Sequence, residues 1–429
     1  MIARALLAEA PVDFVAYDLL EGDGVDRRDQ PLWQRREQLQ ALAMRCPGLR
    51  LSPLVAAEDW SALAAQRASA RERGVEGLML KRIASTYQVG RRRGDWWKWK
   101  VDPLRVTFAV QAFRDHPATT DARLTLAARF ADATSRRIEF HLEYALSQQN
   151  NHGISEVIGL QTAATFWPSL SGSPYWYHAA VKALAKQCAE LIGPDGGFSQ
   201  HSTNYHRLLL QLLAWSEVVE RSAGGTLPEP VRAQALAATD FLATLMESDG
   251  TVPRYGCDDG ANLLPLSGCP FEDFRPSVGA ALALFKGERL PAGPWDETSL
   301  LLLGPISASA DPALRPPAEF RDAGVFQLRH PRGTLFFRAP EEFRTRPSHA
   351  DQLHVSLRWD GEWLTEDPGT YSYNAPGGWD GFAGSRFHNV VTVGEFPADR
   401  PSQRAQAEPE KLLPATLAIP ALLVMSRRK

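Results

Sequence analysis

"RPSHADQLHVSLRWDGEWLTEDPGTYSYN", residues 346–374, alternates apolar and polar side chains with the period of two that is typical of β-strands. Within it, "WDGEW" at 359–363 places Asp-Gly between two such runs, which predicts a hairpin turn. The runs "GVFQLRH" (324–330), "GTLFFRA" (333–339) and "NVVTVG" (389–394) repeat the period. We therefore predict an antiparallel β domain from about residue 320 onward.

Working upstream, the period changes. Between about residues 121 and 310 apolar residues recur at helical spacing, as in "YWYHAAVKALAKQCAELIG" (175–193) and "YHRLLLQLLAWSEVVERS" (205–222). Residues 11–105 instead mix short strand-like runs, such as "EGLMLKR" (76–82) and "WWKWKV" (96–101), with one helical stretch near 59–74. The sequence thus predicts a multidomain chain with an α+β segment, a helical segment and a β segment.

Composition limits the function classes. The chain has 429 residues, of which 44% are hydrophobic and 23% charged, an ordinary globular mixture with a formal net charge of -3. Only the stretch 81–100 is strongly basic, so a general affinity for nucleic acid or anionic membranes is not implied. The four cysteines form neither a close zinc-ligand pair nor a disulfide framework. Without a membrane-spanning run or a secretory signal, we expect a cytoplasmic protein with no membrane partner.

The first segment carries three ordered motifs, "PVDFVAYDLLEGDGVDRRDQPLWQRREQL" (11–39), "EGLMLKR" and "WWKWKVDP" (96–103). Over residues 11–104 it resembles the nucleotidyltransferase domain of ATP-dependent DNA ligases. The resemblance implies that Tyr17, or alternatively Phe14, stacks on adenine and that Glu76 binds the catalytic Mg²⁺. It also implies that three lysines contact the phosphates of ATP: Lys81, Lys98 and Lys100.

The ligase family uses a lysine nucleophile in a Lys-x-Asp-Gly motif upstream of these segments, and no such motif stands in this sequence. The β-barrel expected after "WKWKVDP" is also replaced by helical sequence. We therefore expect an inactive ligase remnant that forms no enzyme-AMP intermediate, with Mg²⁺, ATP and nucleic acid relevant only if the segment were functional.

Four later motifs are "QQNNHGISEVIGL" (148–160), "DGGFSQHSTNYHRLLL" (195–210), the opening stretch and "SRFHNVVTV" (385–393). In this order they resemble the heparinase II/III family of polysaccharide lyases over residues 122–395. The resemblance implies an incomplete α/α toroid followed by an antiparallel β-sandwich, truncated here because residues after 396 show no clear period. We expect domains at 1–105 (ligase fragment), 106–315 (toroid) and 316–429 (truncated sandwich with an irregular tail).

The chemistry implied by the lyase family is β-elimination next to a uronic acid in an acidic polysaccharide. Neutralising the uronate stabilises the charge that develops when the neighbouring proton leaves, a role implied for Asn151 and His152. Tyr205 is the candidate base, acid or both, and His349 is a further acid-base candidate. Since a tyrosine has an ordinary pKa of about 10, its proton must move in concert or a neighbour must lower that pKa. The expected substrate-binding residues are Asn150, Gln200 and His206.

The same resemblance offers a metal site. His349, Asp367 and His388 match positions that can hold a structural zinc ion in the sandwich, and their side chains are suitable zinc ligands. Alternatively, Asp367 begins a turn at "EDPGTY" and His388 merely bonds to it. A ligand role for His349 competes with its acid-base role.

Three functions therefore stay open. The first is a lyase that carries an inactive ligase remnant, the second a fragmentary ligase-type nucleic-acid enzyme, and the third a polysaccharide-binding remnant without catalysis. The sequence does not indicate an oligomeric state.

Overall fold

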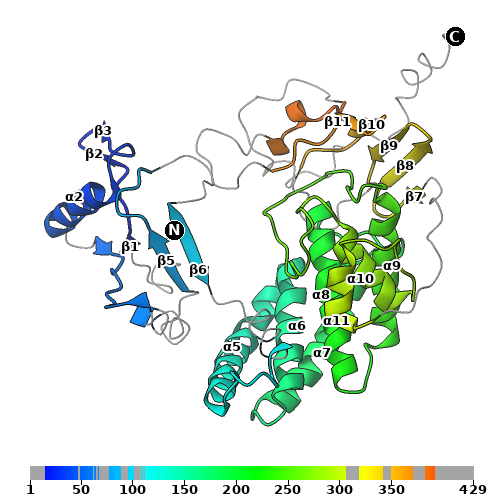
Figure 1. Cartoon of the computed structure of the whole chain (residues 1–429). Helices are drawn as coiled ribbons and strands as arrows, with labels where there is room; N and C mark the ends of the chain where they lie inside the picture. Colours follow the sequence, from blue (N-terminus) through cyan, green and yellow to red (C-terminus); the bar gives the residue numbers. More distant parts are fainter. Residues whose placement is uncertain are drawn as a thin grey trace, which may run out of the picture.

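The computed structural model describes residues 15–46, 49–60, 77–87, 95–100, 112–305, 318–341, 349–370 and 382–391, together with a few isolated positions between them. Figure 1 traces the chain from the N-terminal segment through a group of helices to a β-sheet that lies over one end of that group. In the described part of the chain, no helix is both long enough and apolar enough to cross a lipid bilayer.

The N-terminal segment consists of short strands around one helix. Two-stranded pairings join β1 (Val15–Ala16) to β4 (Arg50–Leu51), β2 (Glu21–Gly22) to β3 (Val25–Asp26) and β5 (Gly77–Lys81) to β6 (Trp96–Lys100). Helix α2 (Leu32–Arg45) contributes Arg35, whose guanidinium makes a fully buried ion pair with Asp18 at 2.8 Å. The predicted α+β texture is present here, although the helix predicted at 59–74 lies largely outside the described residues.

The helical part packs around one central helix. Helix α8 (Thr203–Ser222) is buried on nearly every side, and α6 (Asn151–Phe166), α9 (Glu229–Leu245), α10 (Arg275–Phe285) and α11 (Asp296–Leu303) all contact it. Helices α5 (Asp121–Ser147) and α7 (Ser173–Leu191) pack against α6. The shared core contains Trp176, Leu184 and Leu213, each at most 1% exposed. The helical spacing in the sequence predicted α7 and α8 correctly.

The C-terminal part is one antiparallel sheet with the order β11-β10-β9-β8-β7. Its strands are β7 (Ala318–Phe320), β8 (Val325–His330), β9 (Gly333–Arg338), β10 (Val355–Trp359) and β11 (Glu362–Thr365). The predicted hairpin turn is confirmed, because Asp360 and Gly361 both have positive φ, 50° and 89°. The inward face packs Val325 and Phe336 against Phe241 and Leu245 of α9, so the sheet and the helices share a second core.

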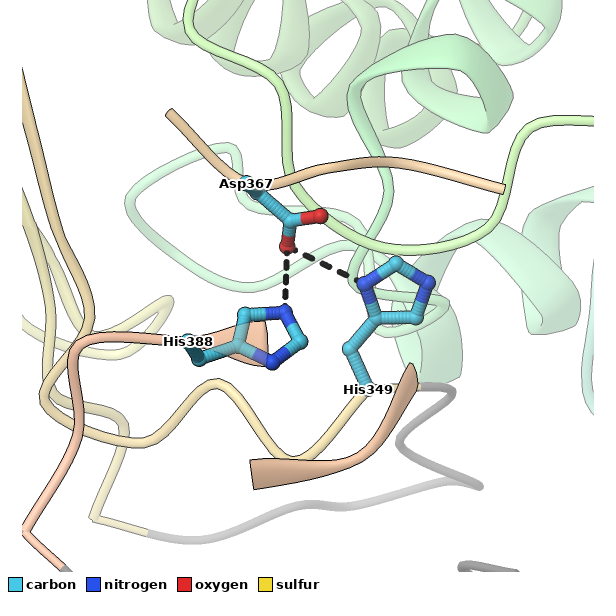
Figure 2. A group of neighbouring side chains, drawn as sticks. All are labelled: His349, Asp367 and His388. Carbon is cyan, nitrogen blue, oxygen red and sulfur yellow. Dashed lines mark hydrogen bonds and ion pairs between the residues drawn. The ribbon is translucent and has the colours of Figure 1, made fainter. Parts of the chain in front are cut away.

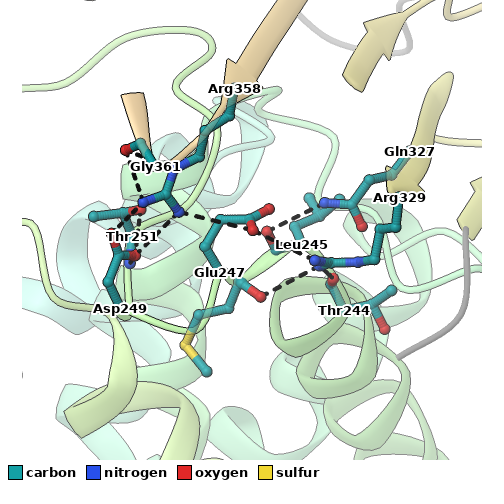
Figure 3. A network of polar contacts seen from close by, with 10 residues as sticks. Thr244, Leu245, Glu247, Asp249, Thr251, Gln327, Arg329, Arg358 and Gly361 are labelled. Carbon is teal, nitrogen blue, oxygen red and sulfur yellow. Dashed lines mark hydrogen bonds and ion pairs between the residues drawn. The ribbon is translucent and has the colours of Figure 1, made fainter. Parts of the chain in front are cut away.

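Polar contacts also join the sheet to the helical part (Figure 3). Arg329 of β8 donates to the carbonyl of Thr244 at 2.7 Å and pairs with Glu247 at 3.4 Å, just after α9 ends. Arg358 of β10 pairs with Asp249 at 2.5 Å and lies 3.8 Å from the same Glu247 carboxylate. The two arginines therefore attach the sheet to the turn that follows α9.

The predicted strand at "NVVTVG" is not observed where the structure describes it, because residues 389–391 adopt no strand. The side chain of Asn389 instead contacts the backbone of Val355, accepting from its N–H and donating to its carbonyl, both at 2.7 Å. The side-chain amide of Asn389 thus makes the two hydrogen bonds to Val355 that the backbone of a neighbouring strand would make. The described β part is accordingly one sheet with no second layer, where the sequence analysis expected a sandwich.

Candidate functional site

The first group of candidate residues lies at the start of α6. Asn150 is the N-cap, and its Oδ1 accepts a hydrogen bond of 2.9 Å from the backbone N–H of His152. The next backbone N–H, that of Asn151, donates to Oε1 of Gln200 at 3.1 Å. His152 is exposed and Asn151 is half-buried, so this helix end presents polar side chains at its positive pole.

The second group lies at the start of α8, within the motif at 195–210. Ser202 is the N-cap, and its hydroxyl accepts from the backbone N–H of Tyr205 at 3.1 Å. The same hydroxyl donates to the carbonyl of Cys257 at 2.5 Å. The Tyr205 side chain is half-buried on the first turn of the helix. The Asn151–Gln200 contact places this helix end beside the start of α6.

The third group is a buried cluster at the sheet (Figure 2). His349 Nδ1 and His388 Nε2 each lie 3.0 Å from Oδ2 of Asp367, and all three side chains are at most 1% exposed. One potential ligand atom from each residue lies within 4.8 Å of the others. The other oxygen, Oδ1, accepts from the N–H of Gly369 at 2.7 Å, so the predicted turn after Asp367 is present as well.

Burial and hydrogen bonding act in opposite directions on the cluster. Burial alone raises the pKa of Asp367, but the hydrogen bonds from the two histidines hold that pKa well below its usual range. Burial alone lowers the pKa of His349, but hydrogen bonds to Asp367 and to the thiol of Cys257 raise it to about 10. A carboxylate oxygen shared by two imidazoles is a place where positive charge is strongly favoured, whether as protons or as a metal ion.

A short loop connects the second and third groups. The backbone N–H of Asp258 donates to Oγ1 of Thr370 at 3.1 Å, three residues after Asp367. Since the Cys257 carbonyl is held by Ser202, the loop runs from the first turn of α8 to the buried cluster. Three hydrogen bonds thus connect the start of α6, the start of α8 and the segment that carries Asp367.

One predicted substrate-binding residue has a different role. His206 is 0% exposed, its Nε2 lies 2.8 Å from the carbonyl of Ala238, and its ring stacks on Phe241 at 4.9 Å. Burial lowers the pKa of His206 to about 4, so the ring is neutral in the core. The expectation that His206 binds substrate is therefore corrected: it is a packing residue between α8 and α9.

His349 is also less accessible than an acid-base residue requires. Its side chain is 1% exposed and Nδ1 is engaged by Asp367. The arrangement favours the ligand role over the acid-base role that the sequence analysis left open.

Two further groups lie next to the cluster. The ring centre of His354 is 5.3 Å from that of His388. Arg338 pairs with Asp351, two residues after His349.

Sequence reasoning missed Ser202, Cys257, Arg338 and Asp351. The only available signal was the turn-rich stretch "YGCDDG" at 255–260, whose Gly256 has φ +73° and lies close to the backbone of His201.

The structure describes only some of the residues to which the ligase resemblance assigns nucleotide binding. The ammonium of Lys81 lies 4.4 Å from the ring centre of Tyr17 and 3.9 Å from that of Trp96, an arrangement of a cation between two aromatic faces. Burial lowers the pKa of Lys81. Lys98 and Lys100 belong to β6, but their side chains, like all of Phe14 and Glu76, lie outside the described residues.

Known protein families match both the N-terminal segment and the rest of the chain. The ATP dependent DNA ligase domain matches residues 2–100, the Heparinase II/III N-terminus matches 77–260, and the Heparinase II/III-like C-terminal domain matches 312–416. The two N-terminal matches overlap at β5 and β6. A DNA ligase of Natronomonas pharaonis is 38% identical over 94 residues, 22% of this chain and 16% of that protein. A probable DNA ligase of Sorangium cellulosum is 37% identical over 101 residues, 23% of this chain and 18% of that protein.

Solved structures of heparinase III share the fold. One is 16% identical with a TM-score of 0.51, covering 87% of this chain and 58% of that one. Another is 19% identical with a TM-score of 0.50, covering 68% and 45%. The chain therefore spans about half the length of these lyases and less than a fifth of the ligases. With its N- and C-terminal heparinase domains, its toroid-like helical part and its antiparallel sheet, the chain belongs to the heparinase II/III family, fused behind a segment of the ATP-dependent DNA ligase domain.

Proposed function

We propose that this chain is a polysaccharide lyase-like protein whose substrate is an acidic polysaccharide containing uronate, cleaved by β-elimination. The observation that carries the proposal is the chain of contacts linking the starts of α6 and α8 to the sheet. It brings Asn151, Gln200 and Tyr205 to one region, although 54 positions separate the first from the last.

We assign a role to each site residue from its position at the start of α6 or α8. Asn151 and His152 stand at the positive pole of α6, where an anionic carboxylate is favoured, and can donate to a uronate. That contact disperses the negative charge which develops as the adjacent proton is removed. Tyr205, half-buried on the first turn of α8, is the proposed base and then acid to the leaving oxygen. Asn150 and Gln200 orient these groups by their bonds to His152 and Asn151.

The experiment is Tyr205→Phe, which removes only the hydroxyl. We expect this variant to lose the ultraviolet absorbance of unsaturated uronate products while it still binds the polysaccharide. The matched control is Tyr175→Phe, because Tyr175 is 62% exposed on α7 and has no proposed role. Full activity in Tyr205→Phe would contradict the assigned chemistry. Binding without turnover in the unmodified protein would favour the non-catalytic remnant instead.

We also propose that His349, Asp367 and His388 hold a structural zinc ion. Ligand atoms about 2.0–2.2 Å from zinc lie about 3.3–3.6 Å apart in a tetrahedron. Two pairs of ligand atoms here are 3.0 Å apart, and all three atoms lie within 4.8 Å of one another. The residue types and the burial both fit such an ion, which would supply a cross-link between the sheet segments. Metal analysis of the purified protein and of His388→Ala tests this, with about one zinc per chain expected only in the former.

The ligase-like segment is proposed as an inactive remnant with boundaries near 1–105, followed by a toroid domain at 106–315 and a sheet domain at 316–429. The contact of Lys81 with both aromatic faces supports a packing role in place of a phosphate contact. We expect no AMP that survives denaturation after incubation with labelled ATP and Mg²⁺. Such a label would favour the ligase-type function.

A further inference from the structure

Helix α5 carries a row of exposed apolar side chains along its length. Leu126, Phe140 and Tyr144 are 61%, 82% and 67% exposed. Figure 1 shows α5 at the edge of the helical part, where it packs against α6 and α7. Isolated apolar residues on a surface need no explanation, but a continuous row of them marks an interaction surface.

The row repeats at the spacing of a coiled-coil seam. Six positions are separated alternately by four and three residues: Leu126, Phe130, Ala133, Arg137, Phe140 and Tyr144. Phe130 and Arg137 are half-buried and the other four are exposed. Because successive residues turn by about 100° around a helix, the row is centred about 120° away from the residues that α5 buries in the core. The row is therefore a second contact face of α5.

The same helix of a second copy fits this face in the antiparallel orientation. A twofold axis near Ser135 places Leu126 opposite Tyr144 of the second copy. It also places Ala133 opposite Arg137 of the second copy, so that the small side chain leaves room for the aliphatic stem of the long one. A parallel pairing would instead set Arg137 against its own copy in the middle of the row, where like charges repel.

The charges beside the row also fit a second copy. Arg129 and Glu143 are both exposed, and each stands one residue before a position of the row. In the antiparallel pair each Arg129 faces Glu143 of the other copy, so the symmetric interface contains this ion pair twice. Since α5 is already folded within the protein, its association carries no cost of helix formation.

We propose that the chain forms a homodimer in which α5 pairs antiparallel with α5 of a second copy. The row spans only about 27 Å from Leu126 to Tyr144, so we expect a reversible dimer of micromolar affinity. The interface does not depend on the lyase chemistry, but it lies near the candidate site. Helix α5 ends at Ser147, and Asn150 caps α6 three residues later, so the second copy borders the start of α6.

Sedimentation velocity of the full-length protein over about 1–100 µM tests the proposal. We expect the mass to rise from that of one chain toward twice that value as the concentration increases. Phe140→Glu should weaken dimerisation about 100-fold, because a charge then enters the symmetric interface twice. The matched control is Leu328→Glu, because Leu328 is 59% exposed on β8, outside the row, and its replacement should leave the dimer intact.

An exchange of charges tests the orientation. Arg129→Glu and Glu143→Arg should each weaken the dimer about fivefold, and the double variant should recover the original affinity. Protein that stays monomeric at every concentration, or a dimer that Phe140→Glu leaves unchanged, would overturn the proposal. A double variant that fails to recover would overturn the antiparallel pairing. Because the substituted side chains are exposed, circular dichroism should show the same helix content in every variant.

Discussion

Arg338 offers the sharpest test of how the sheet supports the buried cluster. Its guanidinium pairs with Asp351 at 3.1 Å, and both side chains are at most 3% exposed. It also lies 4.4 Å from the ring centre of Tyr255. Replacing Arg338 with methionine keeps most of the packing volume but leaves the Asp351 carboxylate buried without its cation.

The expected cost follows from that burial. Removing one partner of a buried ion pair costs about 3–5 kcal/mol, because the remaining charge has lost its water and gains nothing in return. For a folded part of this size, such a loss lowers the melting temperature by about 6–20 °C. Urea and thermal unfolding followed by circular dichroism would measure both quantities.

The same sheet contains a matched control. Arg332 and Asp360 also form an ion pair, but their side chains are 60% and 53% exposed. Arg332→Met should lower the unfolding free energy far less, since water screens the charge that is left. If Arg338→Met were no more destabilising than Arg332→Met, the burial argument would be refuted. Adding Asp351→Leu to Arg338→Met should recover much of the loss, because the unpaired charge is then gone.

Three further outcomes can be measured. Gly256→Ala should cost more than the roughly 1–2 kcal/mol of Gly260→Ala in unfolding free energy, because both glycines have positive φ but only a Cβ on Gly256 meets backbone. Glu217→Gln should lower the unfolding free energy in urea by about 2–3 kcal/mol, since this fully buried carboxylate accepts from two arginines and a backbone N–H. Because burial lowers the pKa of His206 from 6.5 to about 4, the unfolded chain is protonated first. The contribution of neutral His206 to the unfolding free energy should therefore be fully present above pH 6.5 and should fall by about 3 kcal/mol as the pH is lowered to 4. His206→Phe should reduce this dependence of the unfolding free energy on pH.

Local patterns predicted much of this fold. The helical spacing at 175–193 and 205–222 corresponds to α7 and α8, and the alternation at 324–339 corresponds to β8 and β9. The Asp-Gly pair gave the hairpin turn because only a few residues accept positive φ at both positions. The clusters at 150–152 and 199–206 lie at helix starts because Asn150 and Ser202 cap the free N–H groups there.

Long-range contacts explain what the sequence did not reveal. His206 is a packing residue only because Ala238 and Phe241 of the next helix surround it. Cys257 approaches the cluster because the loop bonds to Thr370, 112 positions away. The missing strand at 389–391 depends on Asn389 meeting Val355 across 34 positions. The periodicity of apolar residues over a short stretch of sequence indicates helices and strands, but it does not indicate contacts between residues so far apart in the chain.

The proposed site can form only where the helical part and the sheet meet. Tyr205 is presented by α8, whereas His349, Asp367 and His388 come from segments that accompany the sheet. Arg329 and Arg358 attach that sheet beyond the end of α9. The loop at 257–258 bonds to Ser202 at the start of α8 and to Thr370 beyond β11. Two separated attachments restrict rotation of the sheet against the helices, which a single one would allow. The geometry around Tyr205 therefore depends on residues that touch no substrate, and substitutions at Glu247 or Cys257 should affect turnover through position alone.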